Sequence, residues 1–122
     1  MNDEHLEDLI TYLKFPSIST DSSYSKDVKD CAEWLRKKMI DKGLEAQIHE
    51  TPGHPIVIGK NEHREGLPTI MIYGHYDVQP ADPIDLWESP PFEPRIDDGK
   101  IYARGSTDNK GQNLAHLLGL GE

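Results

Sequence analysis

Residues 71–80 read MIYGHYDVQP, in which strand-forming residues lead into a glycine, a histidine and, two positions later, an aspartate. Residues i and i+2 of a strand point to the same side, so His75 and Asp77 are expected to project together. A metal-binding histidine usually donates its second ring N–H to a carboxylate, which fixes the tautomer of the imidazole. The stretch therefore predicts a histidine–carboxylate pair at a strand end, although an H-x-D pair alone is a weak signal.

Helical patterns precede and follow this stretch. Apolar residues recur at helical spacing over residues 3–15 and again over residues 28–39, and Gly43 is placed to end the second helix. The C-terminal residues 108–122 begin like a third helix. We assign no chemistry to the first two helices.

Strand patterns fill most of the remaining chain. Runs with strand character lie at residues 44–51, 55–60 and 69–73, and the last of them is expected to be buried on both faces. Residues 95–104 predict a hairpin with Asp98-Gly99 in its turn. Helices, then strands, then a helix favour an α/β layer.

The composition indicates a single acidic globular domain over residues 1–122. There are 22 acidic and 13 basic side chains, a formal net charge of -9 at pH 7, and such a chain repels nucleic acid and anionic lipid. We therefore expect neither nucleic acid nor a membrane as partner. Cys31 is the one cysteine, which excludes an internal disulfide, and its helical position indicates a core residue. No run approaches the roughly 18 apolar residues of a membrane span, and the cytoplasm is the expected compartment.

A second polar cluster, ARGSTDNKGQ, occupies residues 103–112. Asp108 lies in the loop before the third predicted helix, from which a carboxylate can reach a site at the edge of the sheet. Spacing alone favours a plainer interpretation, in which Asp108 is the N-cap of that helix. Lys110 is expected to be a solvated charge.

The two clusters together are far more specific than either alone. The segments GHYDVQP (74–80), W-x-x-P-P-F-x-P (87–94) and DGKIYARGSTDNKG (98–111) closely resemble the dinuclear zinc metallopeptidase and amidohydrolase family. That family includes carnosinase-like dipeptidases, glutamate carboxypeptidase, acetylornithine and succinyl-diaminopimelate deacylases, and aminoacylase. The HYDVQP form and the proline-rich insert resemble the dipeptidase branch most. The resemblance implies an α/β fold with the helices packed on a mixed, largely parallel sheet that is incomplete at the C-terminus of this chain.

The resemblance implies a role in metal binding for one imidazole and two carboxylates. His75 matches a ligand of one metal ion, Asp77 matches the active-site carboxylate that orients this histidine, and Asp108 matches the carboxylate that bridges two metals. It also implies a cis peptide bond between Asp108 and Asn109. The expected cofactor is a pair of Zn²⁺ ions, for which Co²⁺ or Mn²⁺ can substitute. The remaining histidines lie outside the motifs and are not expected to be ligands: His5, His49, His54, His63 and His116.

By this resemblance, the complete protein hydrolyses dipeptide amide bonds with a water activated by two zinc ions. Its expected substrate is a small peptide or an N-acyl amino acid, and complete family members are often homodimers. Only two of the usual five metal ligands are present, so we expect an inactive chain that forms the N-terminal portion of the catalytic domain, without the lid or dimerisation domain. The alternatives are an N-acyl amino acid deacylase and a non-catalytic fragment or split-gene subunit. A metallophosphatase is a weaker hypothesis, because the acidic charge does not suit phosphate.

Overall fold

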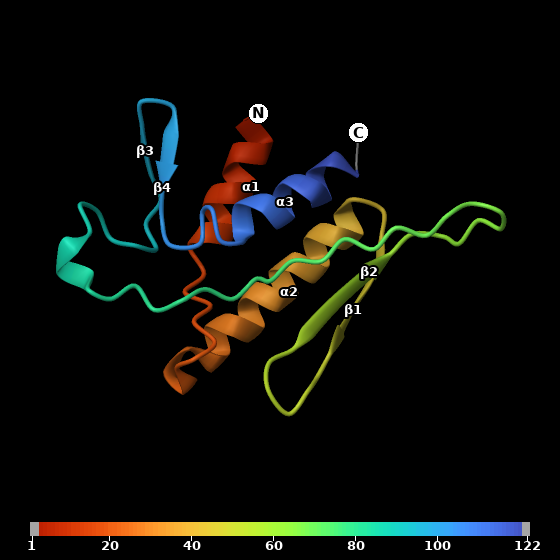
Figure 1. Ribbon diagram of the computed structural model, residues 1–122, viewed down its shortest axis with the longest axis horizontal. Coiled ribbons are helices and arrows are strands. Elements are labelled where there is room, and N and C mark those ends of the chain that lie inside the picture. The colour runs from red at the N-terminus through yellow and green to blue at the C-terminus, as the bar shows by residue number, and fades with distance from the viewer. Residues whose placement is uncertain (1–2, 121–122) are drawn as a thin grey trace.

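The structure, a computed structural model, describes residues 3–120. Its helices are α1 (Asp3–Leu13), α2 (Ser25–Asp41) and α3 (Lys110–Gly119), with short 3-10 turns η1 (Ser22–Tyr24) and η2 (Ile84–Leu86). Its strands are β1 (Glu45–His49), β2 (Ile56–Lys60), β3 (Arg95–Asp97) and β4 (Lys100–Tyr102). Figure 1 shows α1 and α3 together on one side of α2, and the β1–β2 pair on the other.

The core lies where the three helices meet. Each helix contributes the apolar stripe that its sequence spacing predicts, and α1 packs against α3. The Tyr12 ring stacks on Trp34 of α2 with centroids 4.9 Å apart. The buried residues of this cluster are Leu9, Tyr12, Leu13, Cys31, Leu35, Ala103, Leu114, Leu117 and Leu118. The predictions of three helices and of a buried Cys31 are therefore confirmed.

Helix α2 ends as its sequence predicts. Gly43 follows the helix with a φ of 85°, and its N–H donates to the carbonyl of Ile40 at 2.9 Å. A residue in this left-handed conformation closes many helices, and glycine adopts it without a steric penalty. The chain can then reverse at once into β1.

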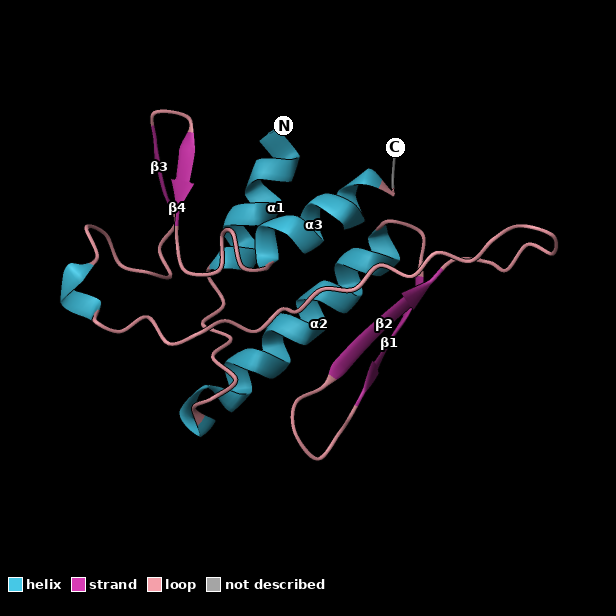
Figure 2. Cartoon of the chain, viewed as in Figure 1, coloured by secondary structure: helices cyan, strands magenta, loops and turns pink. Residues whose placement is uncertain are grey.

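The strands form two separate antiparallel pairs, which Figure 2 shows in magenta. In the first pair, β1 and β2 are joined by a short turn, with Gln47 opposite Ile58, and both strands pack against α2. In the second, β3 and β4 form the predicted hairpin, and Asp98 and Gly99 of its turn both have positive φ. Two helices, four strands and a third helix follow one another along the described chain, so the α/β class is confirmed.

The largely parallel sheet is not formed by residues 3–120. The one parallel contact among them is an isolated bridge between Ile18 and Val78. The physical reason is connection length, because a short turn between consecutive strands permits antiparallel pairing only, whereas parallel strands need a long crossover. Both named pairs have such short turns.

The prediction of a buried strand at residues 69–73 is wrong for the described structure. This segment is extended but is assigned to no strand, and Ile70, Met71 and Tyr73 are 82%, 88% and 84% exposed. The sequence favours a strand here, yet no strand among residues 3–120 pairs with it. Its apolar side chains are exposed because nothing in the described chain covers them.

The proline-rich segment after Val78 is irregular, as predicted, but it is packed. The Trp87 indole N–H donates to the carbonyl of Ala81 at 2.8 Å, and the Arg104 guanidinium lies 5.3 Å from the Trp87 ring centre. This segment thereby folds back toward the loop that precedes α3. No helix within residues 3–120 is long and apolar enough to cross a lipid bilayer.

Substitution of the exposed apolar segment should leave the fold intact. We expect the double variant Met71→Lys, Tyr73→Lys to change the free energy of unfolding by less than about 0.5 kcal/mol, as for other surface positions. It should also reduce self-association, because a flat apolar segment with free backbone groups promotes edge-to-edge pairing. Urea denaturation and sedimentation velocity measure the two effects.

Val78→Lys is the matched control, since Val78 lies in the same part of the chain but is only 3% exposed. It should unfold the chain at much lower urea concentration. A double variant that is as unstable as Val78→Lys would show that residues 71 and 73 are buried in solution.

Candidate metal centre

His75 and Asp77 project to the same side of the chain, as the i, i+2 spacing predicts. The Nδ1 atom of His75 lies 3.0 Å from Oδ1 of Asp77 and 3.1 Å from the Asp77 carbonyl oxygen. On the other side of the ring, His75 Nε2 lies 3.0 Å from Oδ1 of Asp108. The structure thus brings together all three residues that the sequence singled out, across 33 positions of chain.

The arrangement of these atoms suits a metal ion. When Nδ1 donates its proton to Asp77, Nε2 carries a lone pair, and this lone pair faces a carboxylate oxygen of Asp108. Two acceptors that face each other need a cation between them, either a proton or a metal. Neutral imidazole and carboxylate are both ligands that zinc accepts, so the residues fit the metal that the resemblance implies.

In the absence of metal, the proton occupies this position more readily than usual. Burial by itself lowers the pKa of His75, but the hydrogen bonds to the Asp77 carbonyl and to the Asp108 carboxylate, with the charge of Asp77, together raise it by more than burial lowers it. The net effect is a pKa above the ordinary value of 6.5. The imidazolium then donates from both ring nitrogens.

Asp77 is held in turn by the loop between α1 and α2. The Ser19 hydroxyl donates to Oδ2 of Asp77 at 2.5 Å, and the Ser19 carbonyl lies 2.7 Å from Nε2 of His54. Sequence reasoning missed Ser19, because 58 residues separate it from Asp77 and a serine in a polar loop carries no signal of its own. His54 contacts a main-chain carbonyl and does not join the His75 group.

Asp108 does not cap helix α3, so the interpretation that spacing alone favoured is wrong. The N-cap is Asn109, and the Asp108 carboxylate turns away to His75 while its residue remains on the surface, with a side chain 78% exposed. The peptide bond between Asp108 and Asn109 is cis, as the resemblance implies. Both carboxylate oxygens of Asp108 can therefore be approached by a ligand.

Lys110 is not a solvated charge, and this prediction is also wrong. Its residue is 0% exposed, and its ammonium donates to the carbonyls of Tyr12 at 3.0 Å and Phe15 at 2.8 Å. The last carbonyls of an α-helix have no partner within the helix, and here Lys110 satisfies that of Tyr12 near the end of α1. The Phe15 carbonyl, just beyond the helix, also accepts from the Ser17 N–H. Burial lowers the pKa of Lys110 to about 8.

The same loop between α1 and α2 holds the segment that carries His75. The Ser17 hydroxyl donates to the Tyr76 carbonyl at 2.7 Å, and the Val78 N–H donates to the Ser17 carbonyl at 2.9 Å. Two asparagines of the α3 region contact the His75 main chain, Asn109 at the N–H and Asn113 at the carbonyl. Sequence analysis found none of these contacts, since they join segments far apart in the chain.

The ligand set is small in the described chain. Within residues 3–120, no group of three or more His, Cys, Asp or Glu side chains is arranged to hold a metal ion. His75 and Asp108 therefore remain two candidate ligands, with Asp77 behind the imidazole.

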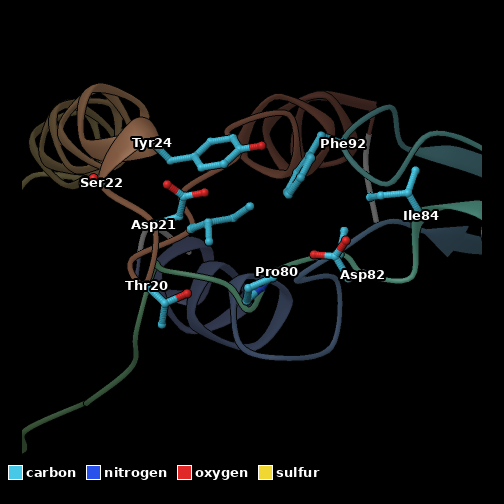
Figure 3. A pocket seen from close by; sticks show the side chains of 10 residues that line it. Thr20, Asp21, Ser22, Tyr24, Pro80, Asp82, Ile84 and Phe92 are labelled. Carbon is cyan, nitrogen blue, oxygen red and sulfur yellow. The ribbon is translucent and has the colours of Figure 1, made fainter.

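A cavity of about 500 Å³ lies between the loop before α2 and the proline-rich segment. Figure 3 shows Asp21 and Tyr24 on one side of it and Asp82 and Phe92 on the other. His75, Asp77 and Asp108 do not line it. The cavity is thus separate from the candidate ligands, although Ser19 lies between two of its lining residues.

The chain is similar to known metallopeptidases in sequence and in fold. Residues 71–122 match peptidase family M20/M25/M40. The chain is 37% identical over 93 residues to cysteinylglycine-S-conjugate dipeptidase of Corynebacterium striatum. This aligned region covers 75% of this chain and 20% of the dipeptidase.

Two solved structures are similar in fold. The M20 family metallo-carboxypeptidase Sso-CP2 from Sulfolobus solfataricus matches this chain with a TM-score of 0.88 and 39% sequence identity. The match covers 98% of this chain and 27% of the carboxypeptidase chain. Human carnosine dipeptidase 1 matches it with a TM-score of 0.90 and 26% sequence identity, over 97% of this chain and 27% of the dipeptidase chain. The chain thus spans about a quarter of the length of the proteins that it matches.

The raised pKa of His75 can be measured directly. In the metal-free chain, we expect an NMR titration of the imidazole to give a pKa above 6.5, and Asp77→Asn should lower it because the neighbouring negative charge is lost. Since the pKa is higher in the folded chain, the stabilisation is full below about pH 6.5 and is lost as the pH rises through the folded-state pKa. An unchanged pKa in Asp77→Asn would contradict the role of this carboxylate.

Loss of the buried ammonium should be costly. Lys110→Met removes two hydrogen bonds from a charged donor, leaving the Tyr12 carbonyl without this donor and the Phe15 carbonyl with the Ser17 N–H alone, and we expect it to lower the free energy of unfolding by about 3 kcal/mol. Lys29→Met, at an exposed position of α2, is the control and should change it by less than about 0.5 kcal/mol. Chemical denaturation of both variants tests this, and equal stabilities would refute the anchoring role.

Proposed function

Since the chain is related in sequence and in fold to the metallopeptidases of family M20/M25/M40, we propose that it supplies part of a metal-dependent active site that hydrolyses the amide bond of dipeptides. The observation that carries the proposal is the pair of His75 Nε2 and Asp108 Oδ1, 3.0 Å apart with Asp77 behind the imidazole. All three residues lie within the segment that matches the family. The proposed metal is zinc, with two ions in a complete site, and Co²⁺ or Mn²⁺ can take its place.

Each of the three side chains has a separate task in this proposal. His75 binds through Nε2, and Asp108 can use both carboxylate oxygens and so bridge two ions. Asp77 accepts the Nδ1 proton, which holds the imidazole in the tautomer that leaves Nε2 free and strengthens it as a ligand. Bound metal ions supply Lewis-acid activation of a water molecule and of the scissile carbonyl.

The protonation of His75 links metal binding to pH. A histidine ligand must be neutral at the nitrogen that binds, and the surroundings of His75 raise its pKa above 6.5. Metal and proton therefore compete for Nε2, and metal affinity should fall as the pH drops below the pKa. The competing proton is the one that both carboxylates stabilise.

The chain of 122 residues is proposed to be inactive alone. Zinc sites use at least three protein ligands, and only His75 and Asp108 are candidates within the described residues. Activity then belongs to a polypeptide, or an assembly of polypeptides, that supplies the remaining ligands and a general base.

The substrate class rests on the relatives. The two named dipeptidases support dipeptides as substrates. An N-acyl amino acid deacylase and a non-catalytic or split-gene subunit stay alternative hypotheses. The assignment of residues 1–122 to the N-terminal portion of a catalytic domain is likewise a proposal, and a homodimer and a cytoplasmic location stay predictions.

Metal binding and turnover test the proposal together. Calorimetric titration of Zn²⁺ into this chain should show weak binding, and His75→Ala or Asp108→Ala should abolish it. A polypeptide of family length that contains these residues should bind Zn²⁺ tightly and cleave dipeptides, and Asp77→Asn should reduce its metal affinity roughly 10- to 100-fold.

His116→Gln is the control, because His116 is exposed on α3 and has no proposed role. Tight zinc binding by the family-length double variant His75→Ala, Asp108→Ala would refute the ligand assignment. Dipeptide turnover by the purified 122-residue chain would refute its proposed inactivity, and preference for N-acyl amino acids in a substrate panel would favour the deacylase.

A further inference from the structure

Both main-chain polar groups of His75 are held by asparagine side chains. The His75 N–H donates to Oδ1 of Asn109 at 3.3 Å, and Nδ2 of Asn113 donates to the His75 carbonyl at 2.8 Å. In a sheet, such groups pair with a neighbouring strand, but no strand among residues 3–120 pairs with this segment. The two amides take the place of that neighbour at one residue.

The contact between the asparagines and the His75 segment is close. A Cβ atom on Gly74 would lie 2.8 Å from Cβ of Asn113 and 2.9 Å from Oδ1 of Asn109. Distances this short exclude any side chain at position 74, so Gly74 is what lets the start of α3 approach the main chain. Asn109 and Asn113 are four residues apart, which places both on one face of the helical turn.

Packing alone does not explain why residue 113 is an asparagine and not an apolar residue of similar size. The Asn113 Oδ1 atom is buried without a hydrogen bond of good geometry within the described residues, although the amide lies beside the Tyr12 hydroxyl and interacts with it. An unsatisfied buried polar atom costs free energy, and a leucine of similar size would avoid that cost. What leucine cannot do is donate to the His75 carbonyl.

We propose that Asn113, together with Asn109, is a positioning residue for metal binding. By fixing the His75 main chain from both sides, the pair determines where the imidazole can point and keeps Nε2 directed at Asp108. The metal-binding part of the inference rests on the proposed function, whereas the clamp on the main chain is independent of it.

The two asparagines use opposite hydrogen-bonding groups, which yields a matched pair of variants. Asn109 acts as an acceptor, a task that an aspartate performs equally well. Asn113 acts as a donor, and a carboxylate in its place has no proton to give and repels the His75 carbonyl. Asn109→Asp and Asn113→Asp make the same chemical change and add the same charge near the site.

Simple electrostatics predicts that both variants bind a cation more tightly, whereas the clamp predicts opposite results. We expect Asn113→Asp to lower the affinity of this chain for Co²⁺ roughly tenfold or more, as for other residues that orient a ligand. Asn109→Asp should bind Co²⁺ at least as well as the unmodified chain. Paramagnetic broadening of the His75 imidazole signals during a Co²⁺ titration registers even weak binding.

A second measurement needs no metal. In the unmodified chain, the His75 amide and the Asn113 side-chain amide should exchange with solvent slowly, because both are hydrogen-bonded. In Asn113→Leu, which keeps the side-chain size, exchange of the His75 amide should accelerate tenfold or more while the unfolding midpoint in urea is unchanged. This variant carries the test if Asn113→Asp does not fold.

The results separate the clamp from the proposed function. Equal Co²⁺ affinities of Asn113→Asp and Asn109→Asp, or an unprotected His75 amide in the unmodified chain, would overturn the inference. If Co²⁺ binds none of the chains while the exchange data are as expected, the proposed function fails and the clamp is supported.

Discussion

The buried ammonium of Lys110 is the interaction on which the arrangement of the site depends. It joins the start of α3 to the end of α1 through the carbonyls of Tyr12 and Phe15. A buried cation cannot leave its acceptors without a large loss of free energy, so the two helix ends are held together. Because Asp108 precedes Lys110 by two residues, this anchor also determines where its carboxylate lies.

From this anchor, hydrogen bonds to the main chain hold the rest of the site. In the loop that follows α1, Ser17 donates a hydrogen bond to the Tyr76 carbonyl and accepts one from the Val78 N–H. The Ser19 hydroxyl in the same loop donates to the Asp77 carboxylate. The amides of Asn109 and Asn113 hold His75 from the side of α3. Three separate parts of the sequence thus meet at one imidazole.

The segment at residues 69–73 shows the opposite situation. It has the apolar, β-branched character of a buried strand, yet Ile70, Met71 and Tyr73 lie in solvent. Local propensity makes the segment extended, but burial requires a partner strand, and none of the described strands is in place to provide one. The His75 segment that follows is nevertheless ordered, because helix ends and loops hold it instead of a sheet.

Local sequence determined much of this protein by itself. Apolar spacing determined the three helices, Gly43 the end of α2, and Asp98-Gly99 the β3–β4 turn, since each depends on neighbours in the chain. Strand geometry likewise put His75 and Asp77 on one side, and the family resemblance picked out Asp108.

Tertiary structure alone decided the remaining contacts. Lys110 is an ordinary surface residue by every local rule, and it becomes a buried anchor only because the fold brings its ammonium to the carbonyls of Tyr12, near the end of α1, and of Phe15, just after it. Ser19 and Asn113 owe their roles to partners 58 and 38 positions away. No spacing rule reaches that far, because the free energy of a buried hydrogen bond depends on which groups the fold brings together.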